Sequence, residues 1–61
     1  MKDMHAHLEK LRRDAAECTL IRDLATDPIK RELFTRMAQH LVTLAGEAEA
    51  AIIASSSIHG A

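Results

Sequence analysis

The sequence is divided by one proline, and the residues around it restrict the fold more than any other feature. Pro28 is the only proline in the chain. Because its ring fixes φ near the helical value and it has no backbone N–H, proline suits the first position of a helix but not the interior. Asp27, directly before it, is a preferred N-cap residue, whose carboxylate can accept from the free N–H groups of the first turn. A helix is therefore predicted to begin at Pro28.

Long stretches without helix breakers lie on both sides of this proline. Residues 4–25 contain no Gly or Pro, and Asp3 can cap their start. A short connection makes two successive helices antiparallel. We therefore predict an all-α, two-helix antiparallel hairpin that forms a single domain over residues 1–61. It consists of a helix over 4–25, a turn at 26–27, a helix over 28–54 and a frayed, serine-containing tail over 55–61.

Apolar residues in the first predicted helix recur every three or four positions. This spacing places them along one face, which is expected to pack against the second helix. The face consists of Met4, Leu8, Leu11, Ala15, Cys18, Ile21 and Ala25. Leu20 and Leu24 lie roughly half a turn away from Cys18 and Ile21, so the end of this helix is apolar on two sides. Only one of these apolar sides can pack against the second helix, so the other must be buried by something outside the hairpin.

The second predicted helix carries two adjacent apolar rows. The first row consists of Leu33, Met37, Leu44 and Ala51, the second of Phe34, Ala38, Ala45 and Ile52, and Leu41 and Ala48 are shared. Together the rows span roughly 140°, which is wider than the arc of about 100° on an ordinary surface helix and is typical of a bundle. We predict that the second row, with two leucines of the first helix, contacts another chain. The predicted interface residues are Leu20, Leu24, Phe34, Ala38, Leu41, Ala45, Ala48 and Ile52.

The size of the chain favours such a contact. A 61-residue chain whose only aromatic residue is Phe34 must build its core from aliphatic side chains. Cores this small seldom supply more than about 3–5 kcal/mol of folding stability without a disulfide, a bound metal or a contact with another chain. Cys18 is the only cysteine, which excludes an internal disulfide, and its place on the apolar row is typical of a small buried side chain. Contact with another chain is therefore the remaining way to stabilise the fold. The simplest case is a two-fold homodimer that forms a four-helix bundle.

No residue pattern indicates catalytic or cofactor chemistry. His5 and His7 are two residues apart, so on a helix they point to different sides and cannot bind one metal ion together. Two ligands also fall short of the three or four that a protein zinc site needs, although a dimer could bring further ligands close. We find no Gly-rich phosphate loop, paired catalytic carboxylates or Ser–His–Asp set. We therefore predict that the chain is not an enzyme and has no catalytic residues, cofactor or metal.

The charge pattern disfavours binding to nucleic acid. The net charge is -1, and each of the basic residues Lys10, Arg12, Arg13, Lys30 and Arg31 has acidic neighbours. No aromatic side chain lies between them for base stacking. No apolar run approaches the roughly 18 residues of a membrane span, and the N-terminus lacks an apolar export segment. A cytoplasmic location is therefore expected.

The order of packing and capping residues adds a resemblance. An A-E-C segment at residues 16–18 and an A-x-D-P turn at 25–28 are followed by a helix with Arg31, Leu33 and Ala38. Over roughly residues 8–50, this order resembles a group of short bacterial helical-hairpin proteins of unknown function. The group commonly has Trp or Tyr near the position of Leu41. The resemblance implies the hairpin and brings no activity, ligand or catalytic residue.

Taken together, these features predict a small self-associating interaction or adaptor module without catalytic activity. The first alternative is a regulatory subunit that is completed by a different, larger protein. The second is a weak nucleic-acid-binding bundle. These alternatives differ in what covers the apolar surface, which the sequence alone does not specify.

Overall fold

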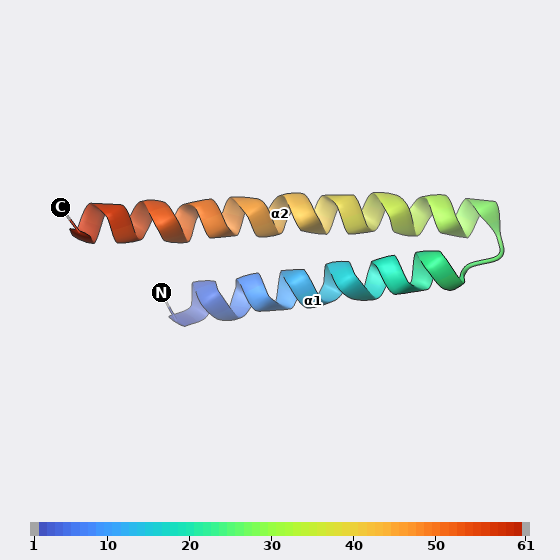
Figure 1. Cartoon of the computed structure of the whole chain (residues 1–61), viewed down its shortest axis with the longest axis horizontal. Helices are drawn as coiled ribbons and strands as arrows, with labels where there is room; N and C mark the ends of the chain where they lie inside the picture. Colours follow the sequence, from blue (N-terminus) through green and yellow to red (C-terminus); the bar gives the residue numbers. More distant parts are fainter. Residues whose placement is uncertain (1, 61) are drawn as a thin grey trace.

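The computed structural model is a single helical hairpin (Figure 1), and it describes residues 2–60, with the side chains of residues 3–56. Helix α1 comprises Lys2–Leu24, and helix α2 comprises Pro28–Gly60. The two helices run antiparallel, so the connection lies at one end and both termini lie toward the other. The hairpin measures 51 × 15 × 11 Å. The predicted all-α antiparallel hairpin is thus confirmed.

Side-chain and backbone hydrogen bonds around residues 25–27 explain why the chain turns there. The Asp27 Oδ1 atom accepts from the backbone N–H of Ile29 at 3.0 Å, and the Asp27 carbonyl accepts from the N–H of Arg31 at 2.9 Å. Asp27 is therefore an N-cap residue, as its position before the proline predicts. On the other side, the Arg31 guanidinium donates to the Ala25 carbonyl at 2.8 Å. This bond satisfies a carbonyl just after the last turn of α1 and ties the two helices together.

Helix α2 continues past the predicted end at residue 54 and reaches Gly60. The predicted frayed tail therefore differs from the structure over residues 55–60, and Ala61 lies outside the described residues. Serine has a moderate helix propensity, and extending an existing helix costs little because its nucleus has already formed. In Figure 1 the last turns of α2 extend past the start of α1.

The core is the single seam between the two helices, and it consists of small and medium-sized side chains. Its members, none more than 9% exposed, are Leu8, Leu11, Ala15, Cys18, Ala25, Ala38, Ala45 and Ile52. Cys18 is a free, buried thiol, as its place on the apolar row predicts. No described side chain is less than 2% exposed. The core is therefore thin and is not sealed from water by a second layer.

Candidate interaction surface

Large apolar side chains are exposed on both helices near the connection. Ile21 and Leu24 lie near the end of α1, and Ile29, Leu33 and Met37 lie near the start of α2, with exposed fractions from 38% for Ile21 to 79% for Ile29. The three α2 residues are four apart and line one side of that helix, and the two α1 residues are three apart. We call these five residues the turn-end patch.

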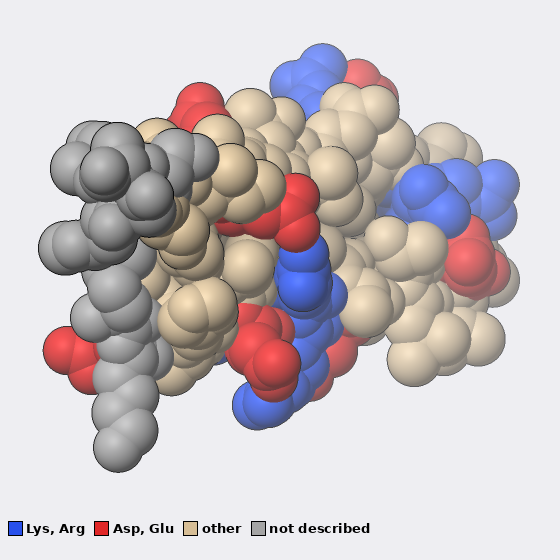
Figure 2. Space-filling view, turned by 60° about the vertical axis from the view of Figure 1, so that its left-hand side comes forward, with Lys and Arg blue, Asp and Glu red and all other residues tan. Residues whose placement is uncertain are grey.

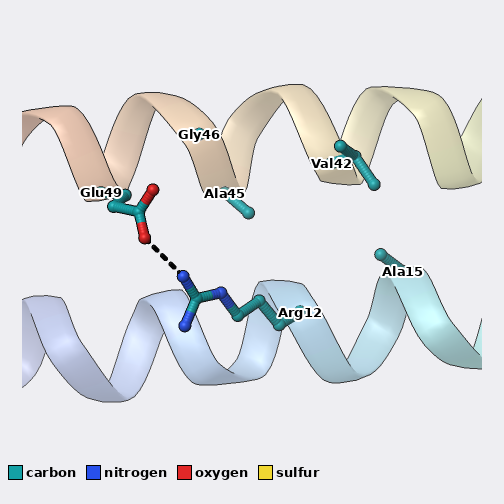
Figure 3. Close-up of a pocket in the computed structure, with 6 residues that line it drawn as sticks. All are labelled: Arg12, Ala15, Val42, Ala45, Gly46 and Glu49. Atoms are coloured by element: carbon teal, nitrogen blue, oxygen red, sulfur yellow. Dashed lines mark hydrogen bonds and ion pairs between the residues drawn. The ribbon is translucent and has the colours of Figure 1, made fainter.

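An ion pair across the hairpin shows that the patch residues of both helices share one face. The Nη2 atom of Arg12 donates to the Oε2 atom of Glu49 at 2.6 Å (Figure 3). Successive residues of a helix are rotated by about 100°, so the angle of each side chain from the buried row can be counted. By this count Arg12 and Glu49 lie on one side of the seam between the helices. Ile21 and Met37 lie on the other side. The turn-end patch therefore occupies the face opposite the ion pair.

The face with the ion pair has a shallow hollow of about 310 Å³ between the helices. Figure 3 shows its lining residues, which are Arg12, Ala15, Val42, Ala45, Gly46 and Glu49. A Cβ atom added at Gly46 would meet nothing within 4 Å, and α2 passes through this glycine as a continuous helix. The hollow thus arises because the opposed side chains are small. Within the hairpin, no close contact or bend requires a glycine at this position.

The predicted interface residues fall into three environments. Leu20 and Leu24 are exposed by 59% and 73%, as the two-sided apolar pattern at the end of α1 predicts. The half-buried members are Phe34, Leu41 and Ala48. The members that are buried against α1 are Ala38, Ala45 and Ile52. These three side chains are therefore already covered within one chain.

Within the hairpin, α2 packs on α1 through the row that the sequence analysis assigned to a contact with another chain. The row with Ala38 and Ala45 packs inside the hairpin, and the row with Leu33 and Met37 is partly exposed. The physical reason is size, because small side chains at a helix contact let the two backbones approach closely. The opposing row of α1 also contains small residues, including Ala15.

The interface predicted from sequence did not include four members of the turn-end patch, which are Ile21, Ile29, Leu33 and Met37. A usable signal was present, since alanines concentrate in one row of α2 and larger side chains in the other. Leu20, in contrast, lies on the side of α1 that points away from its buried row. It is exposed but does not belong to the turn-end patch.

Charged side chains of both signs are interspersed on the surface. Arg22 donates to Asp23 at 3.0 Å, and Arg36 donates to Glu32 at 2.8 Å. On the face drawn in Figure 2, the Lys and Arg side chains lie beside Asp and Glu side chains. Exposed ion pairs of this kind contribute about 0–1 kcal/mol each. This pairing lowers the positive potential that a nucleic-acid backbone would meet on that face.

Within the described part of the chain, no group of three or more His, Cys, Asp and Glu side chains is placed to hold a metal ion. His5 and His7 are both exposed. No helix among the described residues is long and apolar enough to cross a membrane. The exposed apolar side chains are thus the structural feature that most directly indicates a partner interface.

Comparison of the chain with protein-family models, with curated proteins and with solved structures gave no match. The resemblance to short bacterial helical-hairpin proteins therefore stays a prediction. No residue role is transferred from another protein, and the function must be argued from the surface itself.

Proposed function

We propose that this chain is a small, non-catalytic interaction module that associates with itself. Two hairpins pair through the turn-end patch and form a four-helix bundle. The observation that carries the proposal is the exposure of five large apolar side chains on one face of a hairpin with a thin core. Contiguous apolar surface on a small protein marks a contact site.

Covering the exposed apolar surface would contribute a favourable term of the size that association requires. Complete burial of a Leu, Ile or Met side chain contributes about 1.5–3 kcal/mol, and the patch residues are 38–79% exposed. Covering the patch in both copies therefore contributes on the order of 8–17 kcal/mol. This gain is of the same order as the estimated association cost of about 4–15 kcal/mol.

Dimerisation would also supply the interior that a single hairpin lacks. Leu44 is half-buried at the edge of the core, and its position round α2 places it on the same side as Leu33 and Met37. A second hairpin on that face would enclose Leu44 between four helices. Each copy would thus complete the core of the other, which is the packing principle of a four-helix bundle.

The mass in solution, measured by sedimentation equilibrium at several concentrations, tests the proposal. We expect twice the 6.7 kDa mass of one chain at high concentration. On dilution the mass should fall, and the helical circular dichroism signal should fall with it because the thin core is then exposed. A compact monomer that melts cooperatively at high concentration would overturn the proposal.

A regulatory or adaptor role toward a different protein is the second candidate. Val42 and Ile53 are exposed by 60% and 59%, and both lie on the side of α2 that faces away from the turn-end patch. A dimer formed through the patch leaves them uncovered. If a foreign chain instead completes the fold, the purified protein should be poorly helical at every concentration. The same sedimentation and circular dichroism series separates the two candidates.

A further inference from the structure

The positions of apolar and charged residues along the hairpin indicate how two copies would be oriented. We infer that the partner is a second copy packed in parallel, with both connections at the same end and the two-fold axis along the bundle. This inference rests on the proposed self-association and adds the orientation of the second copy. It predicts which residues of the two copies meet.

In the parallel arrangement, α1 of one copy lies against α2 of the other, and residues at equal distances from the connection meet. Ile21 and Leu24 then face Leu33 and Ile29 of the second copy, all of which are more than one-third exposed in the single hairpin. The apolar end of one patch is thus covered by the apolar end of the other. Both copies use the same surface, as a closed two-fold interface requires.

A full-length antiparallel pairing matches these surfaces poorly. It would place the connection of one copy beside the last turns of α2 of the other, beyond the start of its α1, because α2 has 33 residues and α1 only 23. Ile21 and Leu24 would then have no part of the second α1 opposite them. These exposed apolar side chains would therefore remain largely uncovered.

The charges that flank the patch favour the same orientation. Glu17 on α1 and Arg36 on α2 each lie about two helical turns from the connection. Glu17 is on the side of the patch, and Arg36 points outward from the buried row of α2 but lines a hollow with the patch residues Ile29 and Leu33. In a parallel dimer, Glu17 therefore lies level with Arg36 of the second copy, where the two opposite charges can pair.

The Arg36 side chain bonds to Glu32 in the single hairpin at 2.8 Å, but both side chains are well exposed, by 75% and 65%. An exposed pair of this kind holds its geometry weakly. The guanidinium has five donors in a planar fork and can bond a second carboxylate while keeping the first. The contact within α2 is thus compatible with a bond to Glu17 of the second copy.

The extent of the face is consistent with a stable dimer. Standard interfaces bury about 800 Å² per partner, which is roughly one-sixth of the 4734 Å² accessible surface of this chain. A parallel pairing covers one face of the hairpin from the connection to the start of α1. A staggered antiparallel pairing that overlaps only the two turn ends covers a much shorter part of that face.

Distances between spin labels at two positions test the orientation. The labels are attached to cysteines introduced by Thr26→Cys at the connection or Ala50→Cys on an exposed position of α2, both in a Cys18→Ala background whose helicity and mass are checked first. Because neighbouring helix axes lie about 8–10 Å apart, the parallel dimer should give label pairs within roughly 30 Å at both positions.

The other arrangements give different distances. A full-length antiparallel dimer gives a Thr26 pair separated by nearly the 51 Å length of the hairpin. A staggered antiparallel dimer gives a long distance at Ala50. A long distance at either position in a sample with dimer mass overturns the parallel orientation alone. A monomeric mass without coupling between labels overturns the proposed self-association as well.

Charge reversal provides a second test that does not depend on the cysteine variants. Glu17→Lys and Arg36→Glu should each raise the dimer dissociation constant on the order of 2- to 30-fold, because every such contact occurs twice in the dimer. The double variant should return to within about twofold of the original value. Glu9→Lys, at an exposed position on the side of α1 away from the patch, is the matched control and should leave the constant unchanged. A double variant as weak as the sum of both single changes overturns the parallel orientation.

Discussion

Truncation of Leu33 to alanine provides the sharpest test of the proposed interface. Leu33 is 54% exposed in the hairpin and lies in the middle of the α2 part of the turn-end patch. Covering this exposed part contributes about 0.8–1.6 kcal/mol per copy, and two-fold symmetry doubles the effect. Leu33→Ala should therefore raise the dimer dissociation constant by about 15- to 200-fold.

Val42→Ala is the matched control, because Val42 is 60% exposed but lies on the opposite face of the hairpin. Leucine and alanine have similar helix propensities, so Leu33→Ala should leave the helicity of the separated chain nearly unchanged. Sedimentation equilibrium gives the dissociation constant, and circular dichroism gives the helicity. Equal dissociation constants for Leu33→Ala and the unaltered chain, or an equal loss in Val42→Ala, would refute the assignment of the patch.

Further substitutions test the core, the cap and the boundaries of the patch. Leu41→Asp places a carboxylate against the core cluster, which costs several kcal/mol and should abolish helicity and assembly together; a helical, monodisperse monomer would count against the bundle. Leu20→Asp, on the outward side of α1, should leave the mass and helicity unchanged. If the dimer of this variant dissociates, Leu20 must instead be part of the interface. Asp27→Ala removes the 3.0 Å bond to the Ile29 N–H and should destabilise the chain by about 1 kcal/mol in a urea melt; an unchanged midpoint would show that the cap is dispensable. Gly46→Ala should stabilise it by about 1 kcal/mol because the added Cβ meets nothing within 4 Å, whereas a lower melting temperature would reveal a partner helix at this site.

The break between the helices could be predicted from sequence because the causes are local. Asp27 and Pro28 are adjacent, and their effects on capping and φ act within one helical turn. Most of the buried row of α1 could be predicted as well, since a spacing of three or four residues defines a face whatever lies opposite. Ile21 was predicted in this row but is 38% exposed. The C-terminal boundary of α2 could not, because three consecutive serines weaken a helix without ending it.

The candidate interface was the least predictable part. Both rows of α2 are apolar, and a pattern counted on one helix does not specify which row meets α1. The structure resolves this by placing Ala38 and Ala45 inside, with Leu33 and Met37 partly exposed. That choice depends on how closely the two backbones approach, which is a property of both helices together.

The sequence by itself determined that this protein is a two-helix hairpin, that it turns at residues 26–27 and that it has more apolar helix surface than one fold-back covers. These properties follow from single residues and from periodicity along one helix. Only the tertiary structure decided which apolar side chains remain exposed, because burial results from the fit of α1 against α2. The turn-end patch, and every proposal that depends on it, comes from that fit.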